Sequence, residues 1–200
     1  MPIGQSILDA QFDFIDEVIA TEIEICLKIN RQYTSDKLPQ LSAIKFDKKQ
    51  DKKIIKLPIW FDDHDDWNNV LEHTQVTQSK YIEFILSSVF DIAMFGFLPG
   101  FVYLNGLKPE LHVPRKKTPA KYIAADSLAL GDKYLGIYSL PSPGGWHVIG
   151  KLACSVLDIP ALPPLKIKGS DQIKFEAITQ EQFDNIKSQK ISLESYNGIL

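Results

Sequence analysis

The feature that most constrains the fold of this chain is the spacing of its turn residues after Met94. Proline or glycine recurs there every few residues, between short apolar runs. Short runs bounded by turn residues are typical of all-β sandwiches and barrels, because each run suits one strand and is too short for a packed helix. We therefore predict an all-β domain in this part of the chain. Its expected strands are DIAMFGF, KYIAADSLALG, YLGIYSL, WHVIGKLA and QIKFEAIT, and a helix with Thr179 as its N-cap follows them.

The first part of the chain predicts a mixed domain instead. Apolar residues from Ile7 to Ile29 are spaced by three and four, which indicates an amphipathic helix. The second half of that segment, TEIEICLKIN, also alternates with period two, so a strand is the alternative there. The alternating runs LSAIKFD and KKIIKLPIWFD indicate strands, and the charged DKKQDKK between them indicates a hairpin loop.

A further helix is predicted from about Asp65, with Trp67, Val70 and Leu71 on its buried face. The aspartates around His64 do not fit the spacing of a calcium loop, and we interpret them as charges that favour a helix start. A domain boundary is expected near Ser79. The predicted fold is an α+β N-terminal domain over residues 1–79, followed by an all-β barrel over residues 80–200.

Composition narrows the classes of function. A net charge of −3 and a pI of about 5.8 do not favour a nucleic-acid binder. No apolar run approaches the roughly 18 residues that span a bilayer, and the N-terminus does not resemble a signal peptide. Cys26 and Cys154 lie in apolar stretches typical of buried free thiols, and no cysteine–histidine cluster predicts zinc. These features predict a cytoplasmic protein without nucleic-acid or membrane partners.

Two glycine-aromatic segments carry the candidate site. In FGFLPGFVYLNGL, Phe97, Phe101 and Tyr103 are two or four residues apart, so a strand would place them on one face. Pro99 and Gly100 suit the central positions of a type II turn. The aromatic row is either core packing or the wall of a ligand site that the backbone at Gly100 can approach closely.

The second segment, SPGGWHVIGK, contains the spacing G-x-x-x-x-G-K from Gly145 to Lys151. Leu152 stands where a P-loop needs serine or threonine, and the middle residues are bulky strand formers. We interpret this segment as a strand. The Gly144–Gly145 pair before Trp146 is interpreted as an exposed turn at the rim of a site.

Between two prolines, VPRKKTPAK offers Arg115, Lys116, Lys117 and Lys121. The run is either a solvated loop or a site for a carboxylate or phosphate, and Arg115 is best suited to bidentate contact. The four histidines are scattered, and neither a catalytic triad nor a G-x-S-x-G motif is recognised. The sequence therefore assigns no catalytic residue and no metal ligand.

The segments FGFLPGFVYLNGLKPELHVPRKKTP and LGIYSLPSPGGWHVIGK resemble the family of KipI and the B-type subunits of 5-oxoprolinase. The same domain occurs as allophanate hydrolase subunit 1 and within urea carboxylase. The family motif GF-x-PGF-x-YL-x-GL matches Gly96 to Leu107, and the following PR matches Pro114 and Arg115. The resemblance covers about Leu57 to Phe183, and it implies a small N-terminal α/β domain followed by a cyclophilin-like β-barrel.

The activity that this resemblance implies is ATP-dependent opening of 5-oxoproline to glutamate by a hetero-complex. ATP with Mg²⁺ would act in the complex without a tightly bound cofactor. Companion 5-oxoprolinase subunits, first one of the C type, would be the partners. KipI-type members imply a regulatory alternative, in which the chain binds and inhibits a sensor histidine kinase without catalysis. The expected substrate- or nucleotide-binding residues are Phe97, Pro99, Gly100, Tyr103, Arg115, Lys117, Gly144, Gly145 and Trp146.

The sequence also departs from the family pattern. Leu86 precedes Ser87 and Ser88, where the family commonly has a histidine before a small hydroxyl pair. PAKYIAADS replaces a PR-x-R-VPAGS segment, which puts Asp126 at a glycine position, and YL replaces a Gln-Thr pair before GIY. Several polar groups expected to face a ligand are therefore apolar or altered.

Overall fold

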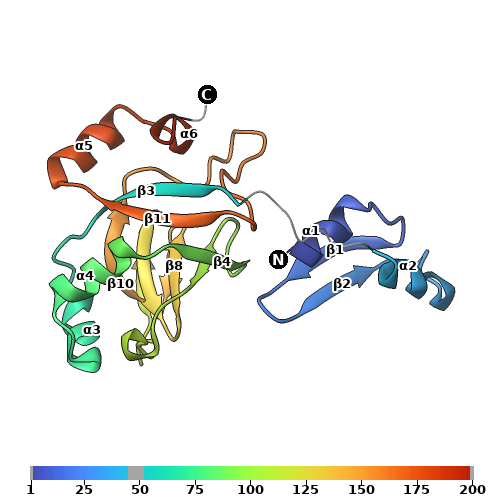
Figure 1. The fold of residues 1–200 in the computed structure, drawn as a ribbon, viewed down its shortest axis with the longest axis horizontal. Coiled ribbons are helices and arrows are strands. Elements are labelled where there is room, and N and C mark those ends of the chain that lie inside the picture. Colours follow the sequence, from blue (N-terminus) through green and yellow to red (C-terminus); the bar gives the residue numbers. More distant parts are fainter. Residues whose placement is uncertain (1, 45–51, 199–200) are drawn as a thin grey trace. The chain divides into compact units, whose positions relative to one another are not determined.

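The computed structural model describes residues 2–44 and 52–198, which form two compact units, Met1–Lys52 and Lys53–Leu200 (Figure 1). Phe14 is fully buried in the first unit, and strands β1 and β2 pair in an antiparallel hairpin. The elements of this unit are α1 (Pro2–Asp9), β1 (Ile15–Ala20), β2 (Ile25–Ile29), the 3-10 turn η1 (Ser35–Lys37) and α2 (Leu38–Ser42).

The helix expected from Ile7 to Ile29 is wrong over most of its length, and the strand alternative is confirmed for β2. The Thr21 side chain accepts the backbone N–H of Glu24 at 3.0 Å, which stabilises a tight turn where the helix would have continued. Cys26 is exposed, contrary to expectation, whereas Cys154 is buried. The expected strand LSAIKFD begins inside α2, and Ala43 and Ile44 follow that helix without forming a strand. Its last three residues, like most of DKKQDKK, lie outside the described residues.

The second unit is a closed seven-stranded barrel in the order β10-β3-β11-β4-β5-β8-β7, with a separate β6–β9 sheet. Every strand predicted after Met94 is present, although KYIAADSLALG forms two strands rather than one. The barrel strands are β3 (Ile54–Trp60), β4 (Phe90–Phe95), β5 (Val102–Asn105), β7 (Ser127–Gly131), β8 (Tyr134–Tyr138), β10 (His147–Leu152) and β11 (Gln172–Ala177). The remaining elements are α3 (Asp66–Thr74), α4 (Gln78–Ser87), η2 (Pro109–Leu111), β6 (Ala120–Ile123), β9 (Ser142–Gly144), α5 (Gln180–Ser188) and α6 (Leu193–Tyr196).

The expected domain boundary near Ser79 falls inside this second unit. Strand β3 lies between β10 and β11 in the barrel, and it pairs with β11 in parallel from Ile54 opposite Gln172 to Ile59 opposite Ala177. Two parallel strands must be joined by a long crossover connection, and here most of the barrel sequence lies between β3 and β11. No local sequence pattern therefore predicts this pair. The segment before Ser79 therefore contributes a barrel strand and α3 to the same unit.

The helices of the barrel unit agree more closely with expectation. Thr179 caps α5 in a capping box: its side chain accepts the Gln182 N–H at 3.2 Å, and the Gln182 side chain accepts the Thr179 N–H at 2.9 Å. Helix α3 buries Trp67 and Val70, and Leu71 is half-buried. Within residues 2–44 and 52–198, every helix is too short or too polar to cross a bilayer.

The C-terminal segment covers one side of β3, beside α5 and α6 (Figure 1). The Asn197 side chain accepts the Lys56 N–H at 2.8 Å and donates to the Lys56 carbonyl at 3.0 Å. The Tyr196 hydroxyl donates to Glu176 on β11 at 3.0 Å. One carboxamide thus pairs both main-chain groups of a strand residue, as a neighbouring strand would.

Strands β5, β8 and β7 carry two different faces. The aliphatic rows Val102–Ile137–Leu128 and Leu104–Leu135–Leu130 run directly across them, and all six side chains are buried in the barrel interior. Because side chains alternate along a strand, the residues between them face outward. The candidate site is built on this outer face.

Candidate functional site

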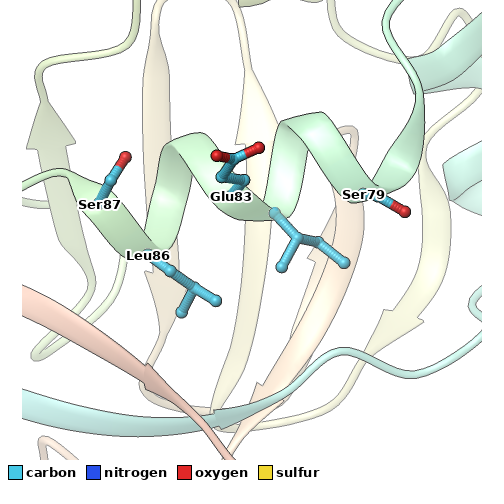
Figure 2. Close-up of a pocket in the computed structure, with 5 residues that line it drawn as sticks. Ser79, Glu83, Leu86 and Ser87 are labelled. Atoms are coloured by element: carbon cyan, nitrogen blue, oxygen red, sulfur yellow. The ribbon is translucent and has the colours of Figure 1, made fainter.

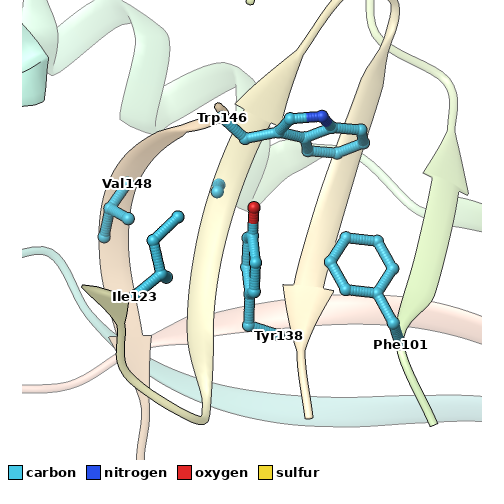
Figure 3. Packing of buried hydrophobic residues seen from close by; sticks show 6 residues of the cluster. Phe101, Ile123, Tyr138, Trp146 and Val148 are labelled. Carbon is cyan, nitrogen blue, oxygen red and sulfur yellow. The ribbon is translucent and has the colours of Figure 1, made fainter. Parts of the chain in front are cut away.

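Outward-facing rings on the barrel form an aromatic layer, by which we mean Phe101, Tyr103, Tyr134, Tyr138 and Trp146. Figure 3 shows three of them, Phe101, Tyr138 and Trp146. The Phe101 ring centroid lies 4.7 Å from that of Tyr103, 4.9 Å from that of Tyr138 and 5.7 Å from that of Trp146. The Tyr138 and Trp146 rings meet Phe101 edge to face, which is a favourable arrangement for aromatic pairs. Since all three of these rings are almost fully buried, the layer is a packed region with little space inside it.

The indole of Trp146 occupies the space that side chains at Gly131 and Gly136 would fill. A Cβ atom at either glycine would lie 2.4 Å from an indole atom. Neither glycine is among the site residues expected from the sequence. The available signal was the glycine at an outward position of SLALG and of YLGIY, since glycine inside a strand marks a close approach.

The turn at Pro99 and Gly100 is confirmed as type II, because Gly100 has a φ of 75° and the Phe101 N–H donates to the carbonyl three residues earlier at 3.0 Å. A Cβ at Gly100 would lie 3.2 Å from Leu157 and 3.3 Å from Ser139. The Ser139 hydroxyl also donates to the Pro99 carbonyl at 2.6 Å. Gly100 therefore allows this turn to pack against the protein itself.

Phe97 is the exposed rim of the aromatic layer. Its side chain is 60% exposed, and its ring stands edge to face with Phe101 at 5.4 Å and with Tyr138 at 6.3 Å. The φ of Phe97 is 66°, a left-handed conformation that is rare for a bulky residue. Such strain is concentrated at ligand-binding and catalytic sites, so this exposed ring is a candidate ligand contact.

Arg115 places a positive charge against this layer. Its guanidinium carbon lies 5.8 Å from the centroid of the Trp146 ring, and its Nε donates to Asp132 at 2.8 Å. Burial, with a smaller contribution from the nearby Tyr103, raises the pKa of Tyr138 to about 12, and Arg115 opposes this shift. Burial also raises the pKa of Tyr103, again against the influence of Arg115. Both phenols are therefore neutral hydrogen-bond donors at physiological pH.

The other predicted site residues are less closely involved. Lys117 is exposed, and in the part of the chain that the structure describes it forms no ion pair or ring contact. Gly144 and Gly145 are half-buried rather than an exposed turn. A Cβ at Gly144 would lie 2.2 Å from the Tyr138 hydroxyl, so this glycine lets β9 cover the aromatic layer.

An open depression of about 510 Å³ lies beside the Arg115–Asp132 pair. Tyr134 belongs both to this depression and to the aromatic layer, where its ring centroid is 5.8 Å from that of Tyr103. The Lys133 ammonium lies 5.0 Å from the centroid of the Tyr134 ring. Cations beside aromatic rings suit a small anionic ligand with an apolar body. The lining residues are His73, His112, Val113, Pro114, Asp132, Lys133 and Tyr134.

A second depression follows the surface of α4, and Figure 2 shows that its lining side chains all come from this helix. Leu86 and Ser87 belong to it. The hydroxyls of Ser87 and Ser88 donate to the Phe84 carbonyl at 3.1 and 2.7 Å, so they satisfy a backbone group at the end of α4. One helix supplies no polar groups that converge from several elements, and this surface is therefore a poor ligand site.

The segment with P-loop-like spacing is a strand, as predicted: residues His147 to Leu152 form β10. The Lys151 ammonium is paired with Asp62 at 2.8 Å. Asp66, from the same aspartate-rich stretch, pairs with Lys116. Two of the four aspartates around His64, Asp62 and Asp66, therefore pair with lysines on β10 and on the basic run.

Residues 7–165 match the family described as carboxyltransferase domain, subdomain C and D. The chain belongs to this family. The resemblance that the two glycine-aromatic segments indicate is thus confirmed, with the family match extending over most of the chain.

Relatives of this carboxyltransferase-family chain carry a common name. It is 26% identical to the B subunit of 5-oxoprolinase from Bacillus subtilis over 152 residues, which cover 75% of this chain and 63% of the relative. It is 34% identical to the B subunit of 5-oxoprolinase from Haemophilus influenzae over 110 residues, which cover 55% of this chain and 52% of the relative. The chain thus spans between about half and two thirds of the length of these relatives.

The fold of the carboxyltransferase-family chain also occurs in a much larger protein. The crystal structure of the Kluyveromyces lactis urea carboxylase superposes with a TM-score of 0.70 at 20% identity, covering 100% of this chain and 20% of that one. At this level of identity, the likeness shows a shared fold.

Proposed function

We propose that this chain acts like the B subunit of 5-oxoprolinase, as a component of a hetero-complex that opens 5-oxoproline to glutamate with ATP hydrolysis. The names of its relatives support the class of complex. The observation that carries the proposal is the Arg115 guanidinium, held against Trp146 at the edge of an open depression. A cation beside neutral phenols and ring faces suits a small cyclic carboxylate, and 5-oxoproline is such a molecule.

In this proposal the carboxylate of 5-oxoproline binds the guanidinium of Arg115. Asp132 engages the Nε atom, which leaves the terminal N–H groups of the guanidinium for the ligand. Tyr134 is the ring that borders the depression, and Lys133 adds a second cation there. Phe97 is an exposed ring at the rim of the aromatic layer. The role of the chain is to bind and orient the lactam, so that its ring lies in a fixed position for the reaction.

ATP would phosphorylate the lactam oxygen and leave as ADP, which makes the lactam carbon a better electrophile. Water would then add to that carbon, the ring C–N bond would break with the nitrogen protonated to the amine, and hydrolysis of the resulting acyl phosphate would release glutamate and phosphate. The residues of this chain contribute cations that offset the negative charge of the substrate carboxylate. Because the segment from Gly145 to Lys151 forms a strand, we assign the nucleotide phosphates to the assembled complex and not to that segment. The proposed partner is a companion that resembles the C-type component of 5-oxoprolinase.

The test is coexpression of the full chain with companion subunits and an assay of 5-oxoproline-dependent release of ADP and glutamate. Arg115→Ala should lower kcat/KM for 5-oxoproline by about 100-fold, because a charge-assisted hydrogen bond to a carboxylate is worth about 1.5–3 kcal/mol. Arg115→Lys should fall between Arg115→Ala and the wild type, because it keeps the charge and loses the planar fork.

Lys80→Ala is the matched control, since Lys80 is an exposed cation on α4. It should leave turnover unchanged. Turnover that survives Arg115→Ala removes Arg115 from the site. A chain that gives no turnover with any companion, and that lowers the autophosphorylation of a sensor histidine kinase, contradicts the enzyme proposal and supports the regulatory alternative.

A further inference from the structure

The segment that carries Arg115 is fastened to the barrel on both sides of that residue; we call residues 113–116 the Arg115 loop. Val113 and Asp132 exchange backbone hydrogen bonds of 3.2 and 2.7 Å. The Pro114 carbonyl lies 3.0 Å from the Nε2 atom of His147. Before Arg115 is reached, the loop is therefore already tied to β10 and to the end of β7.

After Arg115, the loop is fastened again through Lys116. The Lys116 N–H donates to the Gly145 carbonyl at 2.7 Å. The Lys116 ammonium forms an ion pair with Asp66, the first residue of α3. The side chain of Lys116 is 16% exposed, whereas that of Arg115 is 59% exposed. Lys116 is thus the anchored neighbour, and Arg115 is the neighbour that remains accessible.

Asp66 is the buried carboxylate that binds the Lys116 ammonium. It is 7% exposed, and its Oδ2 atom accepts the Val148 N–H at 2.8 Å. The His64 Nδ1 atom lies 3.2 Å from the Asp66 backbone nitrogen and 3.5 Å from Asp66 Oδ2. The Lys116 ammonium pairs with this buried carboxylate, and both side chains are largely shielded from solvent. Removing one member of a buried charge pair leaves the other uncompensated, which makes this anchor costly to break.

We infer that Asp66 is a positioning residue for Arg115: through Lys116 it holds the Arg115 loop so that the guanidinium remains over Trp146. The ligand of Arg115 rests on the proposed function, whereas the placement of Arg115 does not. Asp66 lies on a different element from Arg115 and on a different element from the aromatic layer. Asp66 therefore acts on Arg115 through Lys116 in the loop, and it also accepts the Val148 N–H on β10, two residues after Trp146.

The two arginines of the chain, Arg31 and Arg115, make a direct test possible. In ¹⁵N-labelled full-length protein, each arginine gives one Nε–H signal, and Arg31→Lys assigns them. The Arg115 signal should be displaced by the ring current of Trp146 and should exchange slowly because of the bond to Asp132. Asp66→Asn keeps the size of the side chain and removes its charge. It should shift the Arg115 signal toward the position of a free arginine and speed its exchange.

Asp126→Asn is the matched control, because Asp126 is also a largely buried carboxylate that pairs with a lysine, Lys187, at 2.7 Å. It should leave the Arg115 signal in place even if it destabilises the protein. If Asp66→Asn fails to fold, the double variant Asp66→Asn/Lys116→Met is used instead. It removes both charges of the buried ion pair, so the loop loses the same contact without an uncompensated charge. A folded variant of either kind with an unmoved Arg115 signal overturns the inference.

The assembled complex gives a second readout. Asp66→Asn should lower kcat/KM for 5-oxoproline by about 10-fold, because a small misplacement of a binding group is costly, and Asp126→Asn should not. A shifted Arg115 signal with unchanged kcat/KM in an active complex overturns the role of Asp66 in the reaction. A shifted signal in a chain that supports no turnover with any companion supports the positioning and contradicts the proposed function.

Discussion

The inner and outer faces of strands β5, β8 and β7 are both buried, yet they are packed in different ways. On the inner face, aliphatic side chains such as Leu128 and Ile137 lie directly opposite one another. On the outer face, Gly136 lies between Tyr103 and Ala129 in register, and the Trp146 indole covers the glycine. The inner face is filled by its own strands. The outer face is completed by a ring from the β9–β10 connection, and that ring carries Arg115 above it.

This difference in packing determines which change in side-chain volume destabilises each face. A core of interlocked aliphatic side chains is sensitive to loss of volume, because the surroundings close a cavity only in part. A glycine-lined surface under a large ring is sensitive to added volume, because no space remains between backbone and indole. The two faces should therefore respond in opposite ways to changes in side-chain size.

The largest effect is expected on the inner face. Leu128→Ala should lower the free energy of unfolding by about 2–5 kcal/mol, since it empties a fully buried position. Urea unfolding followed by circular dichroism measures this loss. Ile54→Ala at a half-exposed position of β3 is the control and should cost far less. A loss below about 1 kcal/mol for Leu128→Ala would contradict the cavity argument.

A smaller loss is expected on the outer face. Gly136→Ala should cost about 1–3 kcal/mol, because its Cβ would lie 2.4 Å from the indole of Trp146. Gly145→Ala is the matched control, since a Cβ there would meet no atom closer than 3.8 Å. Combining Gly136→Ala with Trp146→Phe should restore part of the stability. Equal unfolding curves for the two alanine variants would show that the indole does not constrain Gly136.

The smallest effect separates the faces by pH, since the outer face carries a titratable ring. The pKa of Tyr138 in the folded protein is about 12, above its value of about 10 in an unfolded chain. Its contribution to stability is therefore complete below pH 10 and is lost as the pH rises toward 12. At pH 11 this loss amounts to about 1 kcal/mol.

Tyr138→Phe should flatten the decline of unfolding free energy between pH 10 and 12. Tyr122→Phe, at a residue that is 66% exposed, should leave the decline as it is in the wild type. Denaturant midpoints at a series of pH values measure both slopes. Parallel slopes for the wild type and Tyr138→Phe would mean that the phenol is as accessible as in the unfolded chain.

Local signals explain what the sequence could predict. The type II turn at Gly100 and the capping box at Thr179 depend on a few consecutive residues, and both are found as expected. The short strands after Met94 are likewise bounded by their own turn residues. The sequence also brought Arg115 and Trp146 into one hypothesis, and in the structure they are in contact.

Contacts between segments that are far apart in the sequence explain most of what the sequence did not predict. The parallel partner of β3 is β11, at the far end of the barrel sequence, so the unit begins well before the boundary expected near Ser79. The covering of Gly131 and Gly136 by Trp146 likewise depends on the closed barrel. In the first unit, apolar spacing alone did not distinguish a helix from two short strands.

The departure from the family pattern at Asp126 has a local explanation. Asp126 has a φ of 62°, a conformation that glycine adopts freely and that aspartate tolerates better than most residues. Its carboxylate pairs with Lys187 on α5. The replacement of glycine therefore keeps the backbone shape and adds a tie between the barrel and its last long helix.

The carboxamide of Asn197 has a consequence for how this barrel behaves among other proteins. Lys56 presents a backbone donor and acceptor away from β11, and a foreign extended peptide could join the barrel there if they were bare. The Asn197 side chain satisfies both backbone groups of Lys56, so this strand edge is covered without an eighth strand. Loss of the Asn197 side chain would leave the N–H and carbonyl of Lys56 unpaired at an exposed strand edge. Self-association of the protein through this edge would be the first measurable effect.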